Sequence, residues 1–271
     1  MNRKVTHREG AAEQTAWATG ALCAALLLPT ALASTIDTRT LNDISVWAKP
    51  LKFQFSFALH WLTMAWLLQC LAAPARLAAG TRAMLATGGL ATVAELLYIT
   101  VQAARGRASH FNFETVWERA LYYGFMGPAA VLIVAVTAWL GWQVWQHRDP
   151  HCGAGLSLGA ALGLMLGGAL TLLVSTPLAA GVIDGPGHWV GGQRTDALGL
   201  PLFGWSTTGG DLRVPHFFAT HLLQALPLLG WLADRVDRLR AARWVWSGAA
   251  LGLAVVAATT VQAVSGRALL N

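Results

Sequence analysis

The sequence is poor in charge, and this scarcity excludes most classes of soluble protein. Of its 271 residues 12% are charged and 55% are apolar, whereas a soluble domain carries about 25% charged residues. The chain therefore belongs in a lipid bilayer. Its net charge of +6 does not indicate nucleic-acid binding, because the excess Lys and Arg residues lie in short loops between apolar runs, where they encode membrane topology.

Cysteines and catalytic motifs are also scarce. Cys23, Cys70 and Cys152 show no spacing typical of a disulfide framework or a thiolate metal site, so we expect lone buried thiols. The sequence lacks a phosphate loop, a nucleophile elbow, an HExxH zinc motif and a CxxCH haem-attachment motif. Without such motifs, evidence for function must come from polar residues inside the apolar segments.

Long apolar runs are what the chain has in abundance. Because about 20 apolar residues cross a bilayer, the sequence predicts an all-α integral membrane protein with seven transmembrane helices. They cover residues 15–36, 51–73, 83–104, 121–146, 155–182, 214–233 and 243–265. The first run, with its basic start and Ala31-Leu32-Ala33, also resembles a cleavable signal peptide.

The loop charges predict an orientation. The N-terminal segment and the loops 74–82, 147–152 and 234–243 hold ten Lys and Arg residues, and the opposite side holds nine. The densest basic loop contains Arg235, Arg238, Arg240 and Arg243. We therefore predict a protein of a bacterial-type inner membrane with a cytoplasmic N-terminus, a C-terminus outside and a long outer loop over residues 183–213.

An internal duplication is indicated by two matching segments. Residues 101–108 read VQAARGRA and residues 261–268 read VQAVSGRA, and the helices before them align loosely. This predicts one membrane domain with a 3+1+3 parallel repeat: unit one at 15–108, a linker helix at 121–146 and unit two at 155–268. The repeat argues that the first span is retained. The alternative is a chance match between helices rich in Ala and Leu.

This layout resembles that of the SWEET sugar transporters, which join two parallel three-helix units by a linker helix. The resemblance is one of architecture. The proline-glutamine motif of that family is absent, since Pro29 is followed by Thr30 and Pro177 by Leu178. The predicted orientation is also the reverse, so the layout assigns neither a family nor a function.

Polar side chains inside the spans mark a candidate ligand and proton site. Its members are His60, Glu95, Tyr98, Gln102, His216, His221 and Gln224. The rise of a helix puts His60 and Glu95 at similar depth on adjacent antiparallel helices, so we expect them to face each other. A buried carboxylate must pair, bind a cation or stay protonated. The alternative is a neutral Glu95 that hydrogen-bonds between helices.

Three of these residues, His60, His216 and His221, are also candidate metal ligands. His216 and His221 are five positions apart and point to different sides of a helix, which disfavours a simple zinc site. His60 and His221 differ in depth by about one turn, which suits haem b held between facing helices. Ordinary hydrogen bonding is the alternative role for these histidines.

The outer loops contribute a second candidate group. It consists of Arg105, Arg107, His110, His188, Asp211 and Arg213. Glycine clusters such as Gly185-Pro186-Gly187 allow tight turns that fold the long loop back over the helix ends as a lid. The alternative is a flexible surface loop in which Asp211 caps the next helix.

The leading hypothesis is an outward-facing polar cavity that binds and transports a small solute, coupled to a proton or another cation. One alternative is a membrane redox protein that binds haem or a metal. The other is a membrane assembly protein without catalysis. The residues do not distinguish among these classes.

Overall fold

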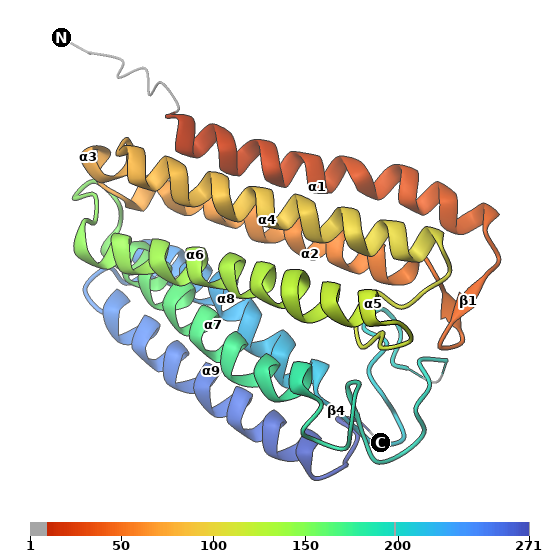
Figure 1. The fold of residues 1–271 in the computed structure, drawn as a ribbon. Helices are drawn as coiled ribbons and strands as arrows, with labels where there is room; N and C mark the ends of the chain where they lie inside the picture. The colour runs from red at the N-terminus through yellow and green to blue at the C-terminus, as the bar shows by residue number, and fades with distance from the viewer. Residues whose placement is uncertain (1–9, 198, 271) are drawn as a thin grey trace.

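The computed structural model describes residues 10–197 and 199–270, and its architecture is a bundle of helices (Figure 1). Each predicted apolar run coincides with a long helix, so the prediction of an all-α protein is confirmed. The long helices in the described residues are α1 (Ala11–Ile36), α2 (Ala48–Leu67), α4 (Ala79–Ala104), α6 (Gly127–Gln146), α7 (Ala154–Ala180), α8 (Arg213–Val236) and α9 (Ala241–Val264). The basic residues Arg3, Lys4 and Arg8, which entered the topology prediction, lie outside the described residues.

Short elements join the long helices. They are the hairpin of β1 (Thr40–Leu41) and β2 (Ile44–Ser45), the 3₁₀ helix η1 (Leu68–Cys70), the π-helix η2 (Tyr122–Met126), the helices α3 (Ala73–Arg76) and α5 (Val116–Leu121), and the pair β3 (Trp189–Val190) and β4 (Gly210–Asp211). Both strand pairs are antiparallel, with Thr40 opposite Ser45 and Trp189 opposite Asp211. Elements β1, α5 and β4 lie at the end of the bundle that holds the C-terminus, opposite α3 (Figure 1).

Five helical segments of the described chain are long and apolar enough to cross a membrane. These are Ala11–Ile36, Ala79–Ala104, Val116–Gln146, Ala154–Ala180 and Ala241–Val264. The protein is therefore a multi-pass membrane protein. The two remaining long helices, α2 and α8, carry charged side chains such as Lys49, Lys52 and Arg213, which lower their hydropathy.

The helices pack as two groups with α6 between them. Helices α1, α2 and α4 contact one another, as do α7, α8 and α9, and α6 packs against both α4 and α7 (Figure 1). The α7–α8 contact is the most extensive. A Cβ atom added at Gly159 would collide with the Leu226 carbonyl, and one at Gly230 with the Gly155 carbonyl. Small residues therefore let these two backbones approach closely, as in other membrane helix pairs.

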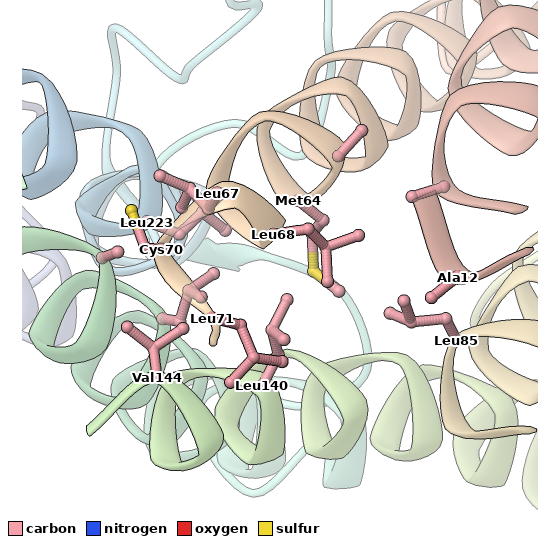
Figure 2. Packing of buried hydrophobic residues seen from close by; sticks show 14 of the residues in the cluster. Ala12, Met64, Leu67, Leu68, Cys70, Leu71, Leu85, Leu140, Val144 and Leu223 are labelled. Carbon is pink, nitrogen blue, oxygen red and sulfur yellow. The ribbon is translucent and has the colours of Figure 1, made fainter. Parts of the chain in front are cut away.

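A close-packed apolar core closes the end of the bundle where α1 begins. Figure 2 shows side chains from the last turns of α2, including Met64 and Leu67, near Leu85 of α4, Leu140 of α6 and Leu223 of α8. Met64, Leu67, Leu85 and Leu140 are fully buried. The buried carboxyl groups of Glu95, Glu118 and Asp211 lie toward the other end, beneath the loops. At the end where α1 begins, Glu13 and Arg76 form a largely buried ion pair.

Two cysteines meet beside this core, which corrects the expectation of lone thiols. The Sγ atoms of Cys70 and Cys152 are 2.7 Å apart. The Asp149 amide donates to the Cys70 carbonyl at 2.8 Å, which holds the loop after α6 against the end of α2. Sequence spacing did not predict the contact, because it arises from the packing of two distant loops.

The environment of Cys152 leads to a prediction about its reactivity. A hydrogen bond with Cys70 lowers the pKa of the Cys152 thiol below its ordinary value, despite its partial burial. Alkylation by iodoacetamide is expected to rise at a lower pH than for an ordinary thiol, because the thiolate is the nucleophile. Mass spectrometry should find the label on Cys152 and not on the fully buried Cys23 and Cys70. A midpoint near the ordinary thiol pKa, or labelling of Cys70 first, would contradict the prediction.

The start of α7 is capped from α8. The amides of Gly155 and Leu156 each donate to the Asp234 carboxylate at 2.8 Å. Asp234→Ala is expected to destabilise the protein by about 0.5–2 kcal/mol, because these amides lose their acceptor. Thermal unfolding in detergent measures the effect. Asp237→Ala, which removes a surface ion pair with Arg240, is the control, and equal shifts in both variants would refute the capping role.

Candidate functional site

Asp211 is the centre of an ion cluster at the start of α8. Its carboxylate is 1% exposed and accepts hydrogen bonds from the Arg213 guanidinium at 2.7 Å and the Ser206 amide at 2.9 Å. His188 Nδ1 lies 3.3 Å away. Burial alone raises the pKa of Asp211, but the nearby His188 and the hydrogen bonds from Arg213 outweigh it and hold the pKa below its usual range. Asp211 is therefore ionised and anchors the loop.

Asp196 belongs to the same cluster. Its carboxylate lies 3.0 Å from Arg213 and 3.6 Å from His188 Nε2. The pKa of His188 is lowered because burial outweighs its two acidic neighbours. The structure thus brings together three of the predicted outer residues, His188, Asp211 and Arg213.

The loop 181–212 is attached to both helix groups. From the first group, Lys52 Nζ donates to the Phe203 carbonyl at 3.0 Å, and Asp43 accepts from Thr195 at 2.7 Å. From the second group, Arg213 donates to the Gly204 carbonyl at 2.5 Å. Gly204 adopts φ = +68°, a conformation that favours glycine. The loop therefore folds over the ends of α2 and α8.

Arg105 and Arg107 belong to a separate cluster around Glu118. Arg107 contacts the Glu118 carboxylate at 2.7 Å and Arg105 at 3.9 Å. The Glu118 amide donates to Thr115 Oγ1 at 3.1 Å, which starts α5. We did not single out Glu118 from the sequence, although its T-x-x-E pattern with Thr115 is a capping-box signal.

His110 lies in the same segment between α4 and α5, but its ring packs near two aromatic side chains. Its ring centroid is 5.5 Å from that of Phe53 and 6.0 Å from that of Tyr122. Burial, aided by the charge of Lys49, lowers its pKa well below the ordinary value. His110 is therefore neutral and joins the loop after α4 to the start of α2.

Glu95 is a buried carboxyl group in the interior of the bundle. It is 3% exposed, and its Oε1 has no hydrogen-bond partner among the described residues. Lys49, in the first turn of α2, lies within electrostatic range of it. Gln54 is similar: its Nε2 donates to Thr30 at 2.9 Å, whereas its buried Oε1 has no partner in the described chain. Sequence reasoning missed both Lys49 and Gln54, although Lys49 lies one turn from Lys52.

The predicted histidines form local hydrogen bonds. His60 Nε2 is 3.1 Å from Thr137 Oγ1 of α6, and no hydrogen bond joins His60 to Glu95 in the described residues. His221 Nδ1 is 3.1 Å from Gln224 Oε1. His216 Nδ1 is buried without a partner among described groups. His60 and His221 lie within electrostatic range of each other.

The structure does not support a metal site at His60, His216 and His221. The described residues contain no group of three or more His, Cys, Asp or Glu side chains that could hold a metal ion. His60, His216 and His221 therefore do not form such a group, and no contact of theirs favours haem b.

Tyr98, Gln102 and Arg105 form a chain along α4. Gln102 Nε2 donates to the Tyr98 hydroxyl at 3.1 Å, and Arg105 donates to Gln102 Oε1 at 2.8 Å. Gln102 is 1% exposed. These hydrogen bonds lead from the charged loop after α4 to Tyr98. Glu95 lies about one helical turn further into the bundle.

Two surface hollows in the described residues include none of Glu95, His60 and His221. One is between α8 and α9 at the opposite end of the bundle, and the other lies beside Phe113, Arg119 and Tyr123. No family model, curated protein or solved structure matches the chain, so the site must be interpreted from its own chemistry.

Proposed function

We propose that this chain is a seven-span inner-membrane protein that binds a small polar solute in its interior and transports it, coupled to a proton or another cation. The observation that carries the proposal is Glu95, a buried carboxyl group whose Oε1 lacks a partner among the described residues. Ionisable residues inside membrane segments are costly and are retained mainly where they function.

The packing of the helices supports a two-unit architecture for this transporter. In it, α1, α2 and α4 form unit one (15–108), α7, α8 and α9 form unit two (155–268), and α6 is the linker (121–146). Each group of three helices has its own internal contacts, and α6 lies between the two groups. A 3+1+3 arrangement requires such contacts. The cytoplasmic N-terminus follows from the loop charges and puts the loop 181–212 outside.

Glu95 suits the coupling role because its two protonation states have different requirements. A protonated Glu95 is neutral and tolerates a buried position, whereas an ionised Glu95 needs a cation or a positively charged partner. Lys49 is the cationic side chain within range. Loss or gain of a proton at Glu95 thus changes the charge balance beside Lys49, which is how proton binding is linked to solute binding in this proposal.

The loop 181–212 serves as the outer gate in this scheme. It is held by hydrogen bonds from Lys52 to Phe203 and from Arg213 to Gly204, one from each helix group. Movement of the two groups relative to each other breaks at least one of these bonds. The apolar core around Met64 and Leu140 closes the inner end at the same time, as alternating access requires.

The proposal is tested by measuring charge movement in proteoliposomes on a solid-supported membrane. Sugars, amino acids, organic anions and organic cations are applied in turn at equal and unequal pH across the membrane. We expect one class to produce a saturable current that depends on the pH difference. The absence of a saturable response to all four classes, in protein whose thermal unfolding confirms that it is folded, would overturn the proposal.

A further inference from the structure

A hollow between α8 and α9 lies at the end of the bundle opposite the polar site. Its volume is about 450 Å³. One side is lined by six residues from the beginning of α9, namely Arg240, Arg243, Trp244, Ser247, Gly248 and Leu251. These residues are spaced by three and four positions and therefore lie on one face of the helix. Leu229 of α8 forms the other side.

The floor of the hollow depends on a glycine. A Cβ atom added at Gly248 would collide with the end of the Leu229 side chain, so this side chain packs directly against the α9 backbone. Beyond this point Leu251 is 67% exposed and continues the hollow as an apolar surface. The hollow is thus charged at the end of the bundle and apolar toward its middle.

The length of this hollow suits a lipid headgroup and the first part of one acyl chain. Arg240 and Leu251 are eleven positions apart, or about 16 Å along a helix axis, which is enough to extend from the headgroup level into the hydrocarbon. Trp244 and Ser247 lie between them. Trp244 provides an indole ring, which favours the membrane interface, and Ser247 provides a hydroxyl group. An Arg pair presents several N–H donors to phosphate oxygens.

We infer that this hollow is a binding site for an anionic phospholipid, with the phosphate held by Arg240 and Arg243 and one acyl chain lying along Gly248 and Leu251. Charge complementarity selects an anionic headgroup. The ion pair of Arg240 with Asp237 has a separation of 3.6 Å and lies at the surface, so it competes weakly with a lipid phosphate. This site is independent of the proposed transport function.

Two neighbouring arginines provide a matched control. Arg235 lies over the Trp231 ring at 3.6 Å and donates to the Trp231 carbonyl at 2.9 Å. Arg235 and Arg238 belong to the same basic loop but do not line the hollow. Replacing them changes the loop charge as much as replacing Arg240 and Arg243 does.

The test uses the full-length protein purified in detergent and mixed with phosphatidylglycerol, phosphatidylcholine or inorganic phosphate. Native mass spectrometry counts the retained lipid, and thermal unfolding reports stabilisation. We expect phosphatidylglycerol to be retained and to stabilise the protein more than phosphatidylcholine. Arg240→Gln/Arg243→Gln is expected to weaken retention about tenfold or more, whereas Arg235→Gln/Arg238→Gln and Glu95→Gln retain it.

Three results would overturn the inference. An equal loss of phosphatidylglycerol retention in the two double arginine variants would mean that the loop charge attracts lipid without a defined site. Equal retention of phosphatidylcholine would indicate unselective boundary lipid. Stabilisation by inorganic phosphate equal to that by phosphatidylglycerol would identify a site for free phosphate, to which the apolar end of the hollow contributes nothing.

Discussion

In the proposed transporter, replacing Glu95 with Gln is expected to abolish the coupling between proton and solute while leaving the protein folded. Gln has nearly the same shape as Glu but cannot release a proton, so the charge beside Lys49 no longer changes with pH. Coupling free energies of this kind correspond to changes of roughly 5- to 150-fold in affinity. The dependence of the solute current on the pH difference should therefore disappear in Glu95→Gln.

Stability provides the second measurement on this variant. Glu95 is 3% exposed and its Oε1 lacks a partner in the described residues, so a neutral amide at this position avoids the cost of burying a charge. We expect the unfolding temperature to be unchanged or higher. Glu114→Gln is the control, because Glu114 forms a surface ion pair at 3.8 Å with Arg107. A Glu95→Gln variant with normal pH-dependent current would exclude Glu95 as the coupling group.

Replacing Arg213 with Gln is expected to release the loop 181–212. Arg213 contacts Asp211, Asp196 and the Gly204 carbonyl, and Asp211 is 1% exposed. Removing the cation leaves a buried carboxylate with too few partners, which costs about 3–5 kcal/mol in comparable buried pairs. Hydrogen–deuterium exchange should rise first in the loop and in β4, because β3 and β4 pair through Trp189 and Asp211.

A matched arginine in the same loop separates this effect from a general loss of charge. Arg194 pairs with Asp184 at 3.4 Å, and both side chains are more than 40% exposed. Surface pairs contribute about 0–1 kcal/mol, so Arg194→Gln should leave exchange in β4 unchanged. Similar exchange in the two variants would show that the buried cluster does not hold the loop.

The sequence predicted the long helices well because apolar runs in a bilayer have few alternatives. Backbone groups in hydrocarbon must be satisfied within the chain, and a helix does this locally. All the runs, from 15–36 to 243–265, appear as helices, with ends that differ from the expected ones by up to six residues, as where α2 ends at Leu67 and not at residue 73. Hydropathy alone was less informative for α2 and α8, since residues such as Lys52 and Arg213 lower it.

The partners of individual side chains could not be predicted in the same way. The rise per residue fixes the depth of His60 and Glu95, but the rotation of each helix is set by its neighbours. His60 therefore pairs with Thr137 of α6, a helix that the depth argument did not include. Contacts between loops, such as Cys70 with Cys152, depend on packing that no spacing in the sequence encodes.

The most direct test of the account is the accessibility of position 95. Glu95→Cys, in a protein whose three native cysteines are replaced by serine, is treated with a small membrane-impermeant thiol reagent applied to either side of oriented vesicles. We predict labelling from the side of the loop 181–212, at a rate that increases when Arg213→Gln is added. Labelling from the opposite side alone, or from neither side in both backgrounds, would contradict a polar interior that opens beneath this loop.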